Sequence, residues 1–177
     1  MKQKLRKILA LLVLSVSVLG LTACGSANDS ETIEYDSAYL QSVSDFLIGS
    51  WNGLSEADLD TYATMDAEDA QDMLDSYGLP FTAEAFTTAF AGYEGSMEEL
   101  GAYVSTDGYE FDTKKDELTL ITHLTYEQRK ADLEIVFNKK SVVQSVTVNP
   151  EYSLGEILAK AGMNTLLGMG TVFAVLI

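Results

Sequence analysis

The hydrophobic period of this chain changes at Gly101, from steps of three and four residues to steps of two. Apolar residues recur before Gly101 at the spacing of amphipathic helices and alternate after it as in half-buried strands. Helices followed by consecutive hairpins predict an α+β domain, in which helices pack on one face of an antiparallel meander sheet. About 125 residues, from about 25 to about 149, suffice for one hydrophobic core.

The first helix is predicted to begin at Asp36 or Ser37, since either side chain is placed to cap its first turn. Its apolar residues recur at helical steps and are expected to face the core. They are Leu40, Val43, Phe46, Leu47, Trp51 and Leu54.

Capping signals divide the rest of the helical half. The predicted N-caps of the later helices and of a short final turn are Ser55, Asp66, Thr82 and Ser96. Two of them have the capping-box spacing, Ser55 with Asp58 and Ser96 with Glu99. Gly78 is expected to end the helix that follows Asp66.

Four strands are expected after Gly101. Residues 102–105 and 109–111 form the first strand and its continuation, with a break at residues 107–108. Residues 138–141 are the turn between the last two strands. The apolar faces of the three later strands are Leu118, Leu120, Leu124 and Tyr126, then Ala131, Leu133, Ile135 and Phe137, then Val142, Val146 and Val148.

The order of helices followed by a meander resembles the cone-shaped nuclear-transport-factor-2-like fold. Residues 97–150 are similar to small bacterial domains of that kind. The resemblance implies a pocket between the sheet and the helices. We therefore take 36–150 as one domain. We expect this domain to be extracytoplasmic, because the residues before it have the pattern of an export signal.

The first 23 residues have the pattern of an export signal. Met1–Lys7 holds four basic side chains, and fourteen apolar or small residues follow, too few for a spanning helix. The run Leu21-Thr22-Ala23-Cys24 resembles the lipobox of bacterial lipoproteins, which implies that Cys24 carries a diacylglycerol. Residues 1–23 are then a signal peptide, and 24–35 hold the lipidated Cys24 and a polar tether. Two or more acyl chains on Cys24 would anchor the protein stably in the membrane.

The segment 154–177 is predicted to be the start of a transmembrane helix. No charge occurs after Lys160, and the seventeen residues 161–177 would reach roughly 25 Å as a helix, slightly less than a bilayer core. The sequence stops on Val-Leu-Ile without an interfacial anchor, so we expect the natural protein to continue past Ile177.

Small residues in this segment predict a helix-packing interface. Gly168, Gly170 and Ala174 allow close approach of a second helix, and Gly170 and Ala174 lie four residues apart on one face. Asn164 is placed to hydrogen-bond across such an interface. The alternative is that glycine is simply common in membrane helices, and the sequence leaves both interpretations open.

Residues 161–177 resemble the start of the membrane helix in gamma subunits of sodium-pumping decarboxylases of the oxaloacetate decarboxylase type. The specific part is Asn-Thr-Leu-Leu-Gly-Met-Gly-Thr-Val-Phe, residues 164–173. The resemblance implies an accessory subunit that joins a biotin-dependent carboxyltransferase subunit to a membrane-embedded, sodium-translocating beta subunit. The cytoplasmic tail of the family is absent from the sequence, and the domain before the helix departs from the family's short forms.

Negative charge dominates the chain. From Gly25 to Glu110 there are nineteen Asp and Glu and no Lys or Arg, and without residues 1–23 the formal net charge is −20. Nucleic-acid binding is excluded, because it relies on Lys and Arg at the phosphates. The acidic surface either keeps an exported domain soluble or concentrates cations near a channel exit.

Few side chains suggest chemistry. His123, the only histidine, is predicted to lie on the solvent face of its strand, and the acids at 58, 60, 66, 68 and 69 do not follow the EF-hand template. A looser acidic site remains open. Neither a nucleotide-binding nor a hydrolase motif is present, so we assign no catalytic residue and no metal ligand to this chain.

We therefore expect a lipid-anchored protein of the bacterial cytoplasmic membrane. The leading hypothesis, from the resemblance, is a non-catalytic gamma-like subunit of a sodium-translocating decarboxylase complex that supports sodium export. It would contact membrane lipid and the beta-like and carboxyltransferase subunits, which would carry sodium and biotin. The alternative is a self-contained lipoprotein binding module that uses the sheet–helix pocket for a small ligand or an envelope protein.

Overall fold

The computed structural model describes residues 35–114, 116–159 and 161–165. Within residues 35–150 of this described part, five helices precede four strands, so the predicted α+β class is confirmed. The helices are α2 (Ser37–Gly53), α3 (Glu56–Ala63), α4 (Ala67–Tyr77), α5 (Ala83–Glu94) and α6 (Met97–Leu100). The strands are β1 (Tyr103–Thr113), β2 (Glu117–Tyr126), β3 (Lys130–Asn138) and β4 (Val143–Pro150).

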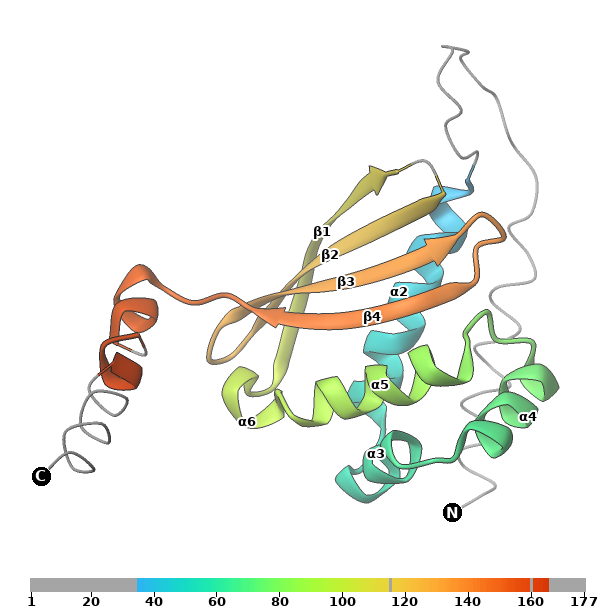
Figure 1. Ribbon diagram of the computed structural model, residues 1–177, viewed down its shortest axis with the longest axis horizontal. Helices are drawn as coiled ribbons and strands as arrows, with labels where there is room; N and C mark the ends of the chain where they lie inside the picture. Colours follow the sequence, from blue (N-terminus) through green and yellow to red (C-terminus); the bar gives the residue numbers. More distant parts are fainter. Residues whose placement is uncertain (1–34, 115, 160, 166–177) are drawn as a thin grey trace, which may run out of the picture.

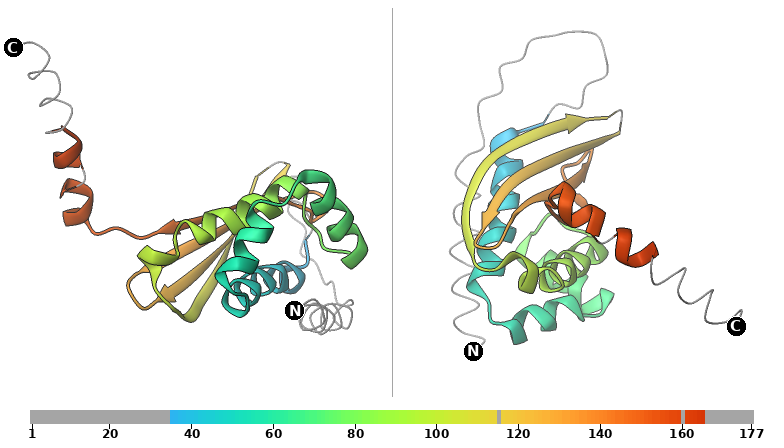
Figure 2. Two further views of the ribbon diagram at one scale, coloured as in Figure 1. Left: turned by 90° about the horizontal axis from the view of Figure 1, so that it is seen from below. Right: turned by 90° about the vertical axis from the view of Figure 1, so that its left-hand side faces the viewer.

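The four strands form one antiparallel meander in the order β1-β2-β3-β4. The sheet is curved, and the helices lie on one of its faces (Figures 1 and 2). Helix α2 is joined to β2 by a buried hydrogen bond between the Ser44 and Thr122 hydroxyls, 2.8 Å apart. The start of α5 is held at the edge of β4, because the Thr82 N–H donates to the Val143 carbonyl.

The core lies between the sheet and the helices. Alternate residues of β2 and β3 point into it, while every third or fourth residue of the helices does so, as the two periods in the sequence predict. Its largest fully buried side chains are Trp51, Phe90, Phe137, Leu40, Leu47, Leu59, Leu74, Leu100, Leu118, Leu120, Leu124 and Leu133.

Most predicted helix caps are confirmed. The Asp36 carboxylate accepts from two backbone N–H groups of α2, and the Asp66 carboxylate does the same for α4. Ser55 and Thr82 cap α3 and α5. Gly78 ends α4 in the left-handed region, with φ of 62°.

The predicted capping box at Ser96 is wrong. The Ser96 hydroxyl donates to the Gly92 carbonyl, 2.8 Å away, and makes no side-chain cap to α6. Glu99, which would complete the box, forms an ion pair with Arg129 instead. The hydroxyl thus bonds back to α5, a choice that Ser readily makes near a helix end.

The expected break in the first strand is also wrong, since β1 is continuous through residues 107–108. Its pairing with β2 shifts between Thr106 and Gly108 and again near Tyr103, so bulges absorb the extra residues without ending the strand. The Asp107 carboxylate accepts from Thr125 and Lys130, which bind the bulge to the strands beside it.

The inward face of β4 differs by one residue from the prediction. Val143, fully buried, takes the place expected for Val142, while Val146 is buried as predicted. The register of β3 against β4 shifts between Val136 and Phe137, and this bulge puts Val143 and Val146 on one face although they are three residues apart.

Candidate functional site

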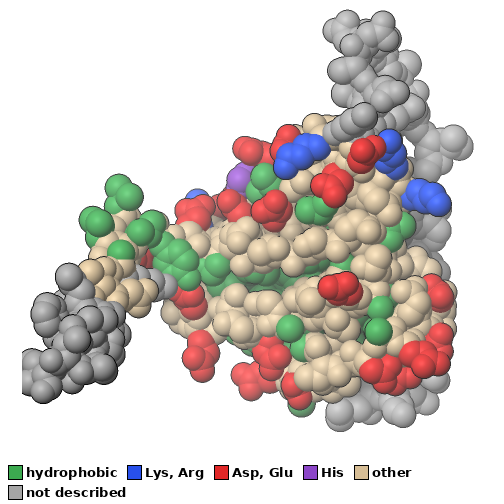
Figure 3. Space-filling model, in the orientation of Figure 1, with side chains coloured by type: hydrophobic (Ala, Val, Ile, Leu, Met, Phe, Trp, Pro, Cys, Tyr) green, Lys and Arg blue, Asp and Glu red, His purple; other side chains and the backbone are tan. Residues whose placement is uncertain are grey.

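A helical segment leaves the domain after β4. Residues 154–159 and 161–165 are helical and project away from the sheet and its helices (Figures 1 and 2). Four large apolar side chains on it are half to four-fifths exposed, which Figure 3 shows as a green surface beyond the domain. They are Leu154, Ile157, Leu158 and Met163. Exposed apolar patches of this kind mark sites of contact with a protein or a membrane.

The predicted site residues divide between this segment and the rest of the chain. Asn164 is on the helical stretch 161–165 and is exposed. Cys24, Gly168, Gly170 and Ala174 lie outside the described residues. None of the helices within 35–114, 116–159 and 161–165 combines the length and the apolarity needed to cross a bilayer.

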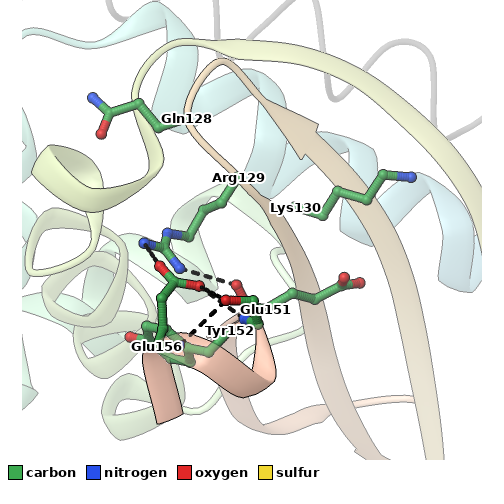
Figure 4. A pocket seen from close by; sticks show the side chains of 7 residues that line it. Gln128, Arg129, Lys130, Glu151, Tyr152 and Glu156 are labelled. Carbon is green, nitrogen blue, oxygen red and sulfur yellow. Dashed lines mark hydrogen bonds and ion pairs between the residues drawn. The ribbon is translucent and has the colours of Figure 1, made fainter. Parts of the chain in front are cut away.

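A polar pocket of about 350 Å³ lies where this helix meets the domain (Figure 4). Its lining comes from the β2–β3 turn, the start of β3 and the residues after β4. These residues are Gln128, Arg129, Lys130, Glu151, Tyr152, Ser153 and Glu156.

Arg129 is the centre of this pocket, and its side chain is 18% exposed. Its Nη2 lies 3.3 Å from the Glu99 carboxylate and 3.1 Å from that of Glu156. Nη1 donates to the Glu151 carbonyl at 3.0 Å, and Nε donates to the Glu99 carbonyl at 3.3 Å. The guanidinium also lies 4.8 Å from the centre of the Tyr152 ring, within cation–π range.

The helix beyond the pocket begins with a full capping box. The Ser153 hydroxyl accepts from the Glu156 N–H, and the Glu156 carboxylate accepts from the Ser153 N–H at 2.8 Å. The hydrogen bonds from Ser153, followed by those from Arg129, lower the pKa of Glu156 from its ordinary value. Glu156 therefore stays ionised and serves both the cap and the ion pair.

Sequence reasoning missed this site. The Ser153-x-x-Glu156 pattern is the local signal for this helix start. The contact between Glu99 and Arg129 joins residues thirty apart in the chain and has no local signal.

Two buried polar atoms lack a hydrogen-bond partner among the described residues, Trp51 Nε1 and Tyr126 Oη. Trp51 stacks on Tyr93 with ring centres 4.5 Å apart, and Tyr103 meets Tyr126 edge to face at 5.8 Å. Burial raises the pKa of Tyr126 far above its ordinary value, so its hydroxyl stays protonated. Buried donors without acceptors are costly, and they commonly mark a bound water or ligand.

His123 lies on the face of the sheet opposite the buried Leu120 and Leu124, as predicted, with its side chain 36% exposed. Its Nδ1 is 2.7 Å from the Asp132 carboxylate on β3, and its Nε2 is 3.5 Å from that of Glu110 on β1. The hydrogen bond to Asp132 and the weaker contact with Glu110 raise the pKa of His123. Partial burial opposes them. The imidazole thus contacts carboxylates of both neighbouring strands, and these contacts favour its protonated form.

Two of the acids that suggested a loose metal site take part in helix capping. Asp58 accepts from the Ser55 hydroxyl at 2.7 Å, and Asp66 caps α4. Within the part of the chain that the structure describes, no group of three His, Cys, Asp or Glu side chains is arranged to hold a metal ion.

Comparisons with protein families, with curated proteins and with solved structures find no significant match to this chain.

Proposed function

We propose that this chain is a non-catalytic, gamma-like accessory subunit of a sodium-translocating decarboxylase complex in a bacterial cytoplasmic membrane. The observation that carries the proposal is the helical segment of residues 154–159 and 161–165, which leaves the domain with Leu154 and Leu158 more than two-thirds exposed. Uncharged residues follow it in the sequence to Ile177, in the segment that resembles the family's membrane helix.

In this proposal Cys24 carries the lipid, the domain lies outside the cytoplasm and the helix returns through the bilayer. The domain is an NTF2-like cone, a proposal that the curved meander with α2 packed across it supports. The chain itself performs no reaction. Biotin belongs to the carboxyltransferase partner and sodium to the beta-like partner.

The proposal is tested by the replacement of Gly170 with Leu. A bulky side chain on the face that holds Gly170 and Ala174 blocks close helix approach, so less beta-like subunit should co-purify while the domain stays folded. Val172→Leu is the matched control, because Val172 lies about 200° around a helix from Gly170. Equal recovery of the partner with both variants would contradict the interface.

A second variant separates the two proposed anchors. Cys24→Ser should abolish lipid labelling yet leave the full-length protein in the membrane fraction, because the helix still holds it. Release of this variant into the soluble fraction would show that the C-terminal segment does not span.

A lipoprotein binding module is the second candidate function. It is favoured by the unpaired Trp51 and Tyr126 donors, which lie between helices and sheet, where an NTF2-like pocket would be. Trp51 is the only tryptophan, so its fluorescence reports directly on this region. A change of that fluorescence on titration with small uncharged hydrogen-bond acceptors would support the module, and an unchanged spectrum, with no ligand recovered from the purified protein, would count against it.

A further inference from the structure

The connection between the domain and the C-terminal helix is short and has little apolar packing. Residues 151–153 have no regular secondary structure, and the side chains of the helix that follows are exposed. A connection of this kind permits a wide range of helix directions unless polar contacts restrict it.

Arg129 supplies such contacts to both sides of the connection. On the domain side it binds the carboxylate and the carbonyl of Glu99, which is in α6. On the helix side it binds Glu156, and between them it binds the carbonyl of Glu151. The Tyr152 hydroxyl adds a further link, since it donates to the Glu99 carboxylate at 2.8 Å. Figure 4 shows the guanidinium between the turn that carries it and the helix start.

Arg129 itself is held firmly by the domain. The Tyr126 N–H donates to the Arg129 carbonyl, and the Gln128 N–H donates to the Leu100 carbonyl, each at 3.0 Å. Gly101, with φ of 76°, brings α6 against this turn, where an added Cβ would lie 3.0 Å from the Gln128 side chain. The planar guanidinium then distributes its N–H donors in fixed directions, which lysine does not do.

We propose that Arg129 is a positioning residue that fixes the direction in which the C-terminal helix leaves the domain. The domain and the helix thus move as one body, and neither is free to swing on residues 151–153. If the helix enters the membrane, which rests on the proposed function, Arg129 also sets the face that the domain presents to its membrane partner.

The test is a distance measurement by pulsed electron–electron double resonance on the full-length protein in lipid nanodiscs. Spin labels are placed at Lys140 and Met163, which are both exposed, in a Cys24→Ser background. The parent protein should give one narrow distance distribution. Arg129→Gln should broaden it by about 10 Å, the spread expected of a free connection of about three residues. Arg129→Lys should give an intermediate width.

Lys130→Gln is the matched control. Although Lys130 lines the pocket, its side chain points away from Arg129 and Glu156 (Figure 4) and pairs with Asp107 at 3.2 Å, so this substitution should leave the distribution narrow. A label pair at Thr88 and Lys140, within the domain, should stay unchanged in every variant and so shows that the domain is folded. A broad distribution in the parent, or a narrow one in Arg129→Gln, would overturn the proposal.

The outcome is independent of the partner experiment. If Arg129→Gln broadens the distribution while Gly170→Leu leaves co-purification unchanged, the positioning role stands and the subunit assignment fails. If co-purification is lost in Gly170→Leu but the distribution is the same in Arg129→Gln and the parent, the assignment stands and the positioning role fails.

Discussion

The helical half and the sheet half of this domain accommodate negative charge in different ways. In the helices the acids cluster in first turns or at N-caps, where backbone N–H groups and the helix dipole stabilise them. In the sheet the carboxylates meet cations, as in the pairs of Lys130 with Asp107 and Lys139 with Asp116. Figure 3 shows acidic side chains along the helices and basic ones toward one end of the sheet.

This difference explains how a segment without Lys or Arg folds despite its charge. Asp36 and Asp66 each accept two backbone hydrogen bonds, so these carboxylates stabilise helix N-termini without a cationic partner. Within the described residues, exposed mid-helix acids such as Asp72 accept no backbone hydrogen bond on their carboxylates, so they add repulsion.

A substitution in the core shared by helices and sheet should lower the free energy of unfolding more than any substitution of a charged residue. Phe90 is 2% exposed and contacts the rings of Trp51, Tyr62 and Phe86, so Phe90→Ala should lower the free energy of unfolding by about 3–5 kcal/mol. Urea denaturation measures this loss. Thr88→Ala, on the exposed side of the same helix, should change it by less than about 0.5 kcal/mol. A loss below about 1 kcal/mol for Phe90→Ala would mean that the aromatic cluster is not packed as described.

The hydrogen bond between Ser44 and Thr122 should show the cost of breaking the polar link between the two halves. Thr122→Val leaves the Ser44 hydroxyl buried without its partner, so the free energy of unfolding should fall by about 1–3 kcal/mol. Ser44→Ala in the same protein removes the orphaned hydroxyl and should recover part of that loss. A double-mutant cycle gives the coupling. Additive effects of the two substitutions would contradict the pairing.

Two acids of α4 should behave in opposite ways. Asp66→Ala removes the cap of the helix and should cost about 1 kcal/mol. Asp72→Ala removes a charge in the middle of the same helix, among other acids, and should be neutral or stabilise the protein by up to about 0.5 kcal/mol. Thermal unfolding of both variants in one buffer makes the comparison. Equal losses would show that capping does not distinguish the acids of this half.

His123 should produce the smallest effect, visible as a pH dependence. The pKa of His123 is raised above 6.5 in the folded protein, mainly by the hydrogen bond to Asp132, so folding favours the protonated ring. Its contribution is complete below pH 6.5 or so and is lost as the pH rises through the raised pKa. The difference in Tm between the parent and His123→Gln should therefore shrink from pH 6 upward, and a difference that grows with pH would contradict the link.

The sequence predicted best what local chemistry determines. The caps at Asp36, Ser55, Asp66 and Thr82 depend on a side chain and backbone groups within three residues of it, and the structure has all of them. The change of period at Gly101 predicted the order of helices and strands for the same reason.

What the sequence did not predict depends on distant partners. The bulge that brings Val143 inward is set by the pairing of β4 with β3, and alternation alone favoured Val142. Glu99 had the spacing of a capping box, but Arg129, far along the chain, binds it. The candidate site at Arg129 is of this second kind, since it joins α6, a hairpin turn and the C-terminal helix.

The proposed function requires that the helix after residue 153 enter a membrane complex. The most direct test is to purify the full-length protein from native membranes in mild detergent and to identify by mass spectrometry what accompanies it. We expect a biotin-dependent carboxyltransferase and a membrane-embedded beta-like subunit in constant ratio to this chain. Recovery of the chain alone, or with soluble envelope proteins only, would contradict it.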